Sequence, residues 1–211
     1  MITLDIFSDP ICPWCFIGKA RLERALESRP DHPFDIRWHP FQLNPDMPPE
    51  GMERDAYLGT KFGDEKAVLA AYAPVVEAAE TTGLTLNLPA ITRTPNTLNA
   101  HRLIHWAGLE GRQNAMVSAL FRAYFQDGRD IGDTETLLEL AKSAGLDHDM
   151  TARLLKTDAD CDAIAQADRT ARARGIQGVP FFIIDNTHAV SGAQPVAVWQ
   201  QVIDELTAPQ P

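Results

Sequence analysis

Apolar and polar residues alternate twice in the first part of the chain, at residues 2–7 and again at residues 34–41. A period of two is typical of β-strands with one buried face. Between these segments, small and apolar residues recur at helical spacing, namely Gly18, Leu22, Ala25 and Leu26. The pattern therefore predicts a strand, a helix and a second strand, which together make a βαβ unit.

The middle of the chain, from about residue 53 to residue 145, shows the i, i+3, i+4, i+7 recurrence of amphipathic helices. Pro74 should kink or break the first of these helices, and the proline-rich segment 44–51 marks the exit from the first layer. Four helices are expected, around residues 68–79, 100–107, 117–125 and 137–144, with one short extended piece at residues 84–88.

The last third of the chain returns to mixed structure. We expect a helix at residues 158–174, an apolar strand at 181–184, a hairpin-type turn at 185–186, a returning strand at 189–190 and a final helix around 199–206. The order is thus βαβ, a helical insert, and then αββα.

Composition and charge exclude several classes of function. The chain carries a formal net charge of −10 over 211 residues, whereas proteins that bind nucleic acid need a basic surface. No apolar run approaches the ~20 residues of a membrane span, and the first residues run into the first strand without an apolar signal segment. We therefore expect a cytoplasmic protein with no nucleic-acid partner and no membrane partner.

A Cys-x-x-Cys pair, Cys12 and Cys15, joins the first strand to the first helix. Pro13 suits the first helical position, so Cys12 falls at the helix N-cap, where free N–H groups and the helix dipole stabilise a thiolate. Cys15 lies one turn further in, on the covered face. We predict an accessible Cys12 as the nucleophile and a covered Cys15 as the resolving thiol.

A zinc site is the alternative for such a pair, but a closed zinc site needs two further ligands. The other thiol, Cys161, lies on an inward helical face with Ile164, which favours a plain buried cysteine over a second resolving thiol. His101 and His105 are one helical turn apart with no evident third ligand, which favours ordinary surface or satisfied histidines. No metal is expected.

Three stretches together resemble a known family: Cys12-Pro13-Trp14-Cys15 after the first strand, Gly178-Val179-Pro180-Phe181 before the third, and Trp38-His39-Pro40-Phe41-Gln42-Leu43. With the helical insert between them, the chain resembles the DsbA-like branch of the thioredoxin-fold oxidoreductases, and within it the cytosolic FrnE-type proteins. The resemblance implies an α/β, thioredoxin-like fold, formed by residues 1–46 and 150–211, with an all-helical insertion at residues 47–149.

The resemblance also implies roles for individual residues. The bond before Pro180 is expected to be cis and to lie beside the cysteines, with the backbone of Val179 free to pair with an extended substrate. Pro13 and Trp14 surround the Cys12 sulfur and tune its redox potential; Trp14 serves either as an apolar substrate contact or as cover for the disulfide.

For two further residues near the expected site, the sequence allows two roles each. Asn96 begins a helix that the resemblance brings over the active site, where it is either a substrate-binding residue or only an N-cap. Asp9 is either a charge opposing the thiolate or, if it points inward, a proton relay to Cys15.

We predict a thiol-disulfide oxidoreductase that exchanges disulfides with protein or small-thiol partners, with glutathione as a candidate thiol and no other cofactor. One alternative is a glutathione-dependent isomerase of the same fold, similar to 2-hydroxychromene-2-carboxylate isomerase; such relatives usually carry Ser and lack the second Cys. A second alternative is a chaperone-like binding protein whose cysteines are incidental.

Overall fold

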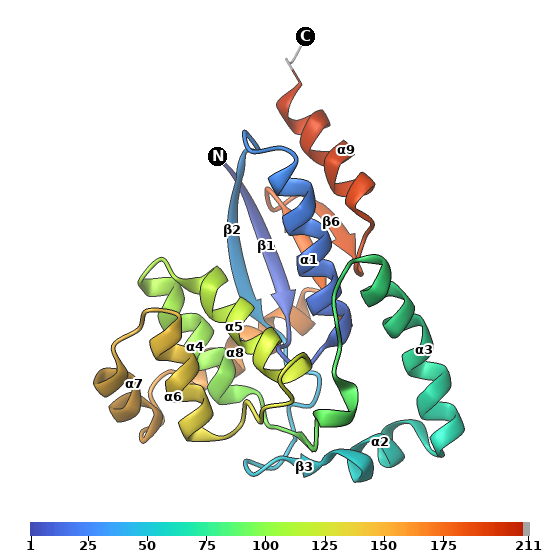
Figure 1. The fold of residues 1–211 in the computed structure, drawn as a ribbon. Coiled ribbons are helices and arrows are strands. Elements are labelled where there is room, and N and C mark those ends of the chain that lie inside the picture. The colour runs from blue at the N-terminus through green and yellow to red at the C-terminus, as the bar shows by residue number, and fades with distance from the viewer. Residues whose placement is uncertain (209–211) are drawn as a thin grey trace.

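The computed structural model describes residues 1–208, and a four-stranded mixed sheet lies at its centre (Figure 1). The strand order is β2-β1-β5-β6; β1 runs parallel to β2 and antiparallel to β5, and β5 and β6 form an antiparallel hairpin. Asp185 and Asn186 make its turn, both with positive φ, as a type I′ turn requires. The strands are β1 (Ile2–Ser8), β2 (Phe34–Pro40), β5 (Phe181–Ile184) and β6 (His188–Ser191).

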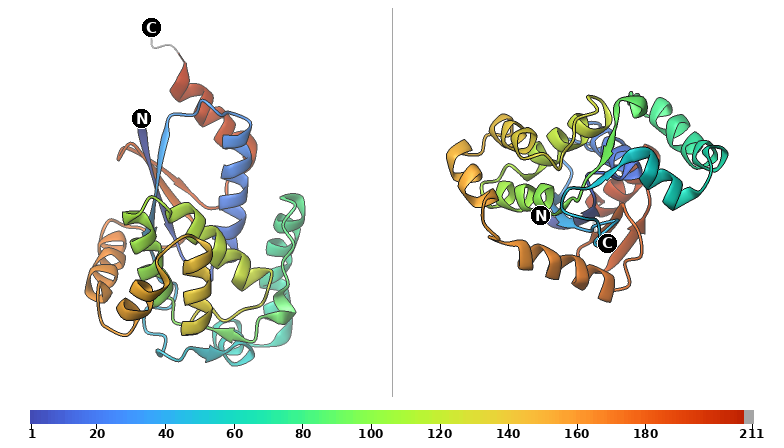
Figure 2. Two further views of the ribbon diagram at one scale, coloured as in Figure 1. Left: turned by 60° about the vertical axis from the view of Figure 1, so that its left-hand side comes forward. Right: turned by 90° about the horizontal axis from the view of Figure 1, so that it is seen from below.

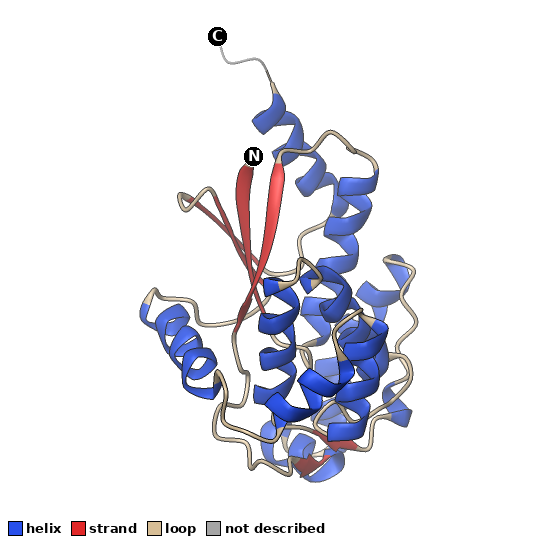
Figure 3. Ribbon diagram, turned by 90° about the vertical axis from the view of Figure 1, so that its left-hand side faces the viewer, coloured by secondary structure: helices blue, strands red, loops and turns tan. Residues whose placement is uncertain are grey.

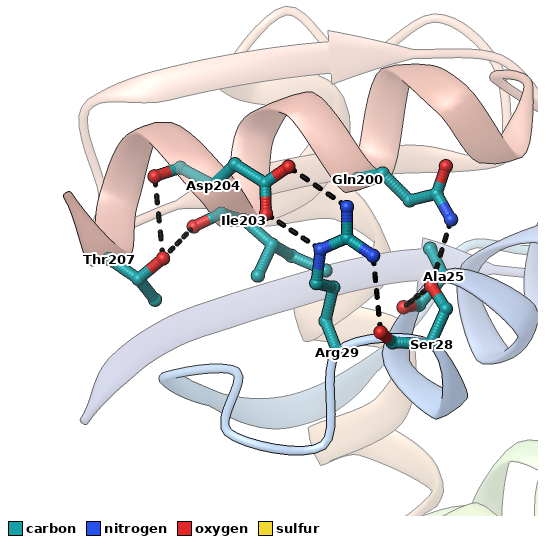
Figure 4. Close-up of polar contacts among 7 residues, drawn as sticks. All are labelled: Ala25, Ser28, Arg29, Gln200, Ile203, Asp204 and Thr207. Atoms are coloured by element: carbon teal, nitrogen blue, oxygen red, sulfur yellow. Dashed lines mark hydrogen bonds and ion pairs between the residues drawn. The ribbon is translucent and has the colours of Figure 1, made fainter.

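Helices cover both faces of this sheet. Figure 3 shows α8 (Cys161–Ala173) on one face and α1 (Pro13–Glu27) with α9 (Val196–Thr207) on the other. Arg29, just beyond α1, donates two hydrogen bonds to the carboxylate of Asp204 on α9, at 2.7 and 3.0 Å (Figure 4). The Gln200 amide donates to the hydroxyl of Ser28 at 2.8 Å. These contacts hold α9 along the end of α1.

The segment between β2 and α8 forms the predicted helical insertion. The views in Figure 2 show α2 and α3 on one side of the molecule and α4 to α7 on the other. Its elements are β3 (Met52–Glu53), α2 (Arg54–Phe62), α3 (Glu65–Thr81), the 3₁₀ turn Leu88–Ala90, β4 (Arg93–Thr94), α4 (Leu98–Leu109), α5 (Gln113–Phe125), α6 (Thr134–Ser143) and α7 (His148–Leu155). The thioredoxin-like α/β fold with a helical insertion is confirmed.

Several details differ from the sequence-based expectation. The insertion holds a two-stranded ribbon, β3 with β4, and residues 84–88, expected to be extended, form no strand. Pro74 does not break α3, which runs on through it with the proline exposed to solvent. The boundary expected at residue 150 falls inside α7. The division into two domains therefore stays a prediction.

One apolar core joins the sheet layers to the insertion. The ring of Phe16 on α1 stacks on Phe121 and Phe125 of α5, with centroids 5.3 and 5.8 Å apart. A smaller cluster of Ile17, Val75 and Ala79 fixes α3 against α1. Within residues 1–208, no helix is both long and apolar enough to span a membrane.

Candidate active site

Cys12 occupies the N-cap of α1, and Pro13 is the first helical residue, as predicted. The backbone of Cys12 is extended (φ −89°, ψ 114°), and its carbonyl oxygen accepts from the N–H of Cys15 at 3.1 Å. Pro13 suits this place because the first N–H of a helix has no partner within the helix. Both cysteines are free thiols in this structure.

The two thiols differ in what they face rather than in total exposure. Cys12 is 4% exposed and Cys15 1% exposed, so the expectation of an openly accessible Cys12 is wrong. Cys12 nevertheless lines a cavity of about 300 Å³, which we call the Cys12 cavity, and Cys15 does not. Residues of the insertion helices α2 and α3 line the same cavity as Cys12, and no local sequence pattern shows this. A partner in this cavity meets Cys12 first.

The loop before β5 forms one wall of the Cys12 cavity. Its Val179–Pro180 peptide bond is cis, as expected, and the Cys12 thiol donates a hydrogen bond to the Val179 carbonyl oxygen at 3.5 Å. Pro180 is buried against α1, where a Cβ built on Gly18 would lie 3.0 Å from the proline ring. Gly18 thus permits the close approach that brings Val179 to Cys12.

Of the predicted substrate-binding residues, Pro13, Trp14 and Val179 line the Cys12 cavity. Pro180 does not line it; it contributes to a separate surface hollow along the same loop. Trp14 also packs against the cluster of Ile17, Val75 and Ala79, and the choice between its two predicted roles stays a prediction.

Asn96 does not line the Cys12 cavity. Its side-chain amide donates to the main-chain oxygen of Met47 at 2.6 Å, and its oxygen accepts from the N–H of Leu98 at 2.9 Å. The N-cap of α4 is Thr97 rather than Asn96. Asn96 therefore links the start of α4 to the proline-rich segment, and its role in binding substrate stays a prediction.

Sequence reasoning missed the polar residues that the insertion contributes to the Cys12 cavity. They lie on α2, β4, α3 and α5, far from the cysteines in sequence, and no local pattern marks them as partners of the motif. They are Arg54, Tyr57, Lys61, Tyr72, Thr94 and Tyr124.

Cys15 lies behind Cys12, in surroundings that keep its proton. Burial raises the pKa of the Cys15 thiol well above its usual value, and the neighbouring Cys12 raises it further. The Ser8 hydroxyl and the main-chain N–H of Asp9 lie within hydrogen-bonding reach of the Cys15 thiol and oppose that shift. Cys15 is therefore protonated at neutral pH, and it needs a base before it can attack as a thiolate.

Asp9 points inward and is fully buried. Its carboxylate accepts from the N–H groups of Leu43 at 2.6 Å and Ile11 at 3.4 Å. Burial, the largest effect, raises the pKa of Asp9 to about 7. Asp9 thus has the inward orientation on which its interpretation as a proton relay to Cys15 depends; the relay itself stays a prediction.

His101 lies beside Asp9, with Nε2 3.7 Å from the carboxylate oxygen Oδ1. Burial lowers the pKa of His101 to about 4, so its ring is neutral at neutral pH. Within residues 1–208, Nε2 has no hydrogen-bond partner, so the expectation of a surface or satisfied histidine does not describe it. His101 and His105 both line a hollow of about 680 Å³ between β2, α4 and α8.

Cys161 is the first residue of α8 and is half-buried, whereas a buried cysteine was expected. The helix begins three residues later than predicted, which leaves Cys161 at its edge. In the part of the chain that the structure describes, no three His, Cys, Asp or Glu side chains are grouped as metal ligands.

Comparison with known proteins places this geometry in a family. A probable DsbA oxidoreductase from Streptomyces coelicolor is 32% identical, covers 100% of this chain and 92% of its own, and superposes with a TM-score of 0.86. Two structures under 25% identical share the fold. A 2-hydroxychromene-2-carboxylate isomerase has a TM-score of 0.72 at 19% identity, with 97% of this chain and 95% of its own covered. The cytosolic disulfide reductase DsbM from Pseudomonas aeruginosa, solved with GSH, has a TM-score of 0.69 at 20% identity, with 97% and 98% covered.

The family model described as DSBA-like thioredoxin domain matches residues 3–204, from β1 to α9, and so takes in the cysteine pair, the insertion and the Val179 loop. The suspected resemblance is confirmed: this chain belongs to the DSBA-like thioredoxin family.

Proposed function

We propose that the protein catalyses thiol-disulfide exchange, with Cys12 as the attacking thiol and Cys15 as the resolving thiol. The observation that carries the proposal is the unequal placement of the two sulfurs. Cys12 faces the cavity from the N-terminus of a helix, whereas Cys15 lies behind it and has a raised pKa. An isolated cysteine pair without a role would not need this arrangement.

The exchange proceeds in two steps. The Cys12 thiolate attacks one sulfur of a partner disulfide; the partner's S–S bond breaks, a Cys12–partner disulfide forms, and the departing thiolate takes up a proton. Cys15 then loses its proton and attacks the Cys12 sulfur, which forms the Cys12–Cys15 disulfide and releases the second partner thiol. The partner is reduced by two electrons and the protein is oxidised; the reverse sequence oxidises a dithiol.

The residues behind and beside the cysteines serve these steps. Asp9 is a buried carboxyl group whose pKa of about 7 suits it to accept the proton that Cys15 loses. Val179 lines the cavity wall, and we assign to its main chain the pairing with an extended partner segment. Pro13 and Trp14 complete the wall around the Cys12 sulfur.

Protein thiols or glutathione are the proposed partners, and the cytosol is the proposed compartment. The DsbM structure that shares this fold is described as a cytosolic disulfide reductase and was solved with GSH. A dithiol active site suits a reducing compartment, where disulfides are transient.

Serine substitutions test the assignment. Cys12→Ser is expected to abolish reduction of a model disulfide, because a hydroxyl does not replace the thiolate. Cys15→Ser should accumulate mixed disulfides at Cys12, detectable by mass spectrometry of the intact protein. Cys161→Ser, the matched control, should leave the rate unchanged.

Retention of the wild-type rate by Cys12→Ser would overturn the proposal. A glutathione-dependent isomerase needs no second thiol, so full turnover by Cys15→Ser on an isomerase substrate would favour that alternative. A chaperone-like protein would suppress aggregation equally well without either cysteine.

A further inference from the structure

We infer that the Cys12 cavity takes a small thiol or disulfide bearing a carboxylate, and that this carboxylate binds at Arg54, with Lys61 nearer the solvent. The inference rests on the proposed function, because it names the class of partner with which Cys12 exchanges. Three features of the structure support it: the charge of the cavity wall, the bonding of Arg54 and the enclosure of Cys12.

The wall of the Cys12 cavity has the opposite charge to the whole protein. The chain has 29 Asp and Glu against 19 Lys and Arg, for a net charge of −10. Among the described residues that line this cavity, however, two are cations, Arg54 and Lys61, and none is Asp or Glu. An acidic protein thus presents a cationic wall beside its nucleophile, and such a wall attracts anions.

Arg54 is buried, 6% exposed, and its described partners are neutral. Its Nη2 donates to the Tyr72 hydroxyl at 2.8 Å, and its Nη1 to the hydroxyls of Tyr124 at 3.1 Å and Thr94 at 3.5 Å. Burial raises the pKa of Tyr124 well above its usual value, so that phenol stays neutral. These groups orient the guanidinium but do not neutralise it.

No carboxylate among residues 1–208 lies within 4 Å of the Arg54 guanidinium. Glu53, its neighbour in sequence, is exposed and accepts instead from the N–H of Ala56. A buried charge without a counter-ion is costly, and a guanidinium pairs with a carboxylate through a planar fork of N–H groups. Arg54 therefore supplies a recognition site for a ligand carboxylate.

The enclosure of Cys12 limits the size of the partner. Cys12 is 4% exposed, and the cavity that reaches it has a volume of about 300 Å³, the lower end for small-molecule sites. Lys61 is exposed, with its ammonium hydrogen-bonded to Tyr57 at 2.8 Å, so it lies at the open side. A compact thiol fits between the Cys12 sulfur and these cations more readily than a folded protein does.

Thiols of matched size and different charge test this inference. The oxidised full-length protein is mixed with 3-mercaptopropionate, 2-mercaptoethanol or cysteamine, and loss of the Cys12–Cys15 disulfide is followed by acid quenching and mass spectrometry. Rates are compared per thiolate, with each thiol's own ionisation measured. We expect the anionic thiol to react roughly tenfold faster than the neutral one, which is what one charge-assisted hydrogen bond supplies, and the cationic thiol to react slowest.

Substitutions at Arg54 and Lys61 test whether these residues cause the preference for the anionic thiol. Arg54→Gln should reduce the anionic-to-neutral rate ratio roughly tenfold, and Arg54→Lys should retain part of it. Lys61→Gln, at an exposed position that tolerates change, should reduce the ratio to a smaller extent. The control Arg37→Gln removes an exposed arginine that pairs with Asp35 on β2 and should leave the ratio unchanged.

The outcomes separate this inference from the proposed function. Equal rates for the three thiols, or an unchanged ratio in Arg54→Gln, would overturn the carboxylate site while leaving thiol-disulfide exchange intact. If no Cys12–Cys15 disulfide forms under oxidation, or no thiol reduces it, the proposed function itself fails.

Discussion

Asp9 and His101, which lie behind the cysteines, should make the stability of the protein depend on pH, because burial moves their pKa values in opposite directions. The pKa of Asp9 rises to about 7 and the pKa of His101 falls to about 4, so both groups are neutral near pH 6. Other polar groups near Asp9 are Thr97, which lowers its pKa, and Asp168, which raises it. The pair therefore adds no net charge to the interior in the weakly acidic range.

Asp9→Asn tests this assignment through stability. Folded Asp9 holds its proton up to about pH 7 and the unfolded chain up to about pH 4, so the folded state loses stability as pH rises through that window. The variant should lack this loss, and its stability relative to wild type should rise by on the order of 4 kcal/mol between pH 4 and pH 8. Urea unfolding at a series of pH values measures the difference; coincident pH profiles would contradict it.

His101→Gln serves as the contrasting variant in the same experiment. Unfolded histidine gains a proton below about pH 6.5, whereas folded His101 stays neutral down to about pH 4, so wild-type stability falls as pH drops through that window. The glutamine variant should lose this acid sensitivity and keep the Asp9-dependent loss at higher pH. Asp9→Asn should thus change stability at the higher pH values, and His101→Gln should change it at the lower ones.

At this scale the sequence predicted where the cysteine pair lies, at the start of α1, but not its surroundings. Cys12 and Cys15 are recognisable because their spacing is a local signal. Arg54 is not, because a single arginine in a polar segment is usually on the surface, and only tertiary contacts bury it against Tyr72 and Tyr124. Asn96 lies beside the true N-cap, an offset that capping propensities do not resolve.

At the scale of elements, α1 positions the site through its contact with the Val179 loop. Gly18 allows this contact, since the proline ring of Pro180 and the backbone of Ala193 occupy the space around its Cα. A β-branched side chain there would push the loop away from the helix. The distance between Cys12 and the Val179 carbonyl depends on that packing.

Gly18→Val is therefore expected to lower the free energy of unfolding by ~1–3 kcal/mol, the usual effect of overpacking, and to slow the reaction at Cys12. Gly59→Ala is the matched control: Gly59 is a helical glycine on α2 with open space around it, and alanine should stabilise the protein by ~0.5–1 kcal/mol. Denaturant unfolding and disulfide reduction rates provide the measurements. A Gly18→Val protein as stable and active as wild type would mean that the loop does not depend on this contact.

The periodicity of apolar residues predicted most helices and strands, and it missed elements that bury polar residues or are very short. Helix α2 buries only Arg54 and α7 only Thr151, so the buried positions of these two helices form no apolar repeat. The ribbon of β3 with β4 pairs two residues on each strand, too few for an alternating pattern. The helix α3 continues past Pro74 because that residue is exposed, where one missing hydrogen bond is replaced by solvent.

At the scale of the whole molecule, the core shows how the insertion depends on the sheet. Buried residues of β1, α1, α4, α5 and α6 belong to one continuous cluster, which includes Phe16 stacked on Phe121. The sequence division at residues 47 and 149 separates these elements, but their apolar contacts cross it. The chain should unfold as one cooperative unit, since neither part buries its core alone.

Phe121→Ala tests that unity, because Phe121 is almost fully buried on α5 and contacts α1 through Phe16. Removing its ring should cost ~3–5 kcal/mol. If the core is shared, hydrogen exchange through global unfolding should accelerate by the same factor in β1 and β5 as in α5 and α6. Leu109→Ala, at an exposed position on α4, is the control and should change stability by no more than about 0.5 kcal/mol. Faster exchange confined to α4, α5 and α6 would show that these helices open independently of the sheet, and it would contradict a single cooperative unit.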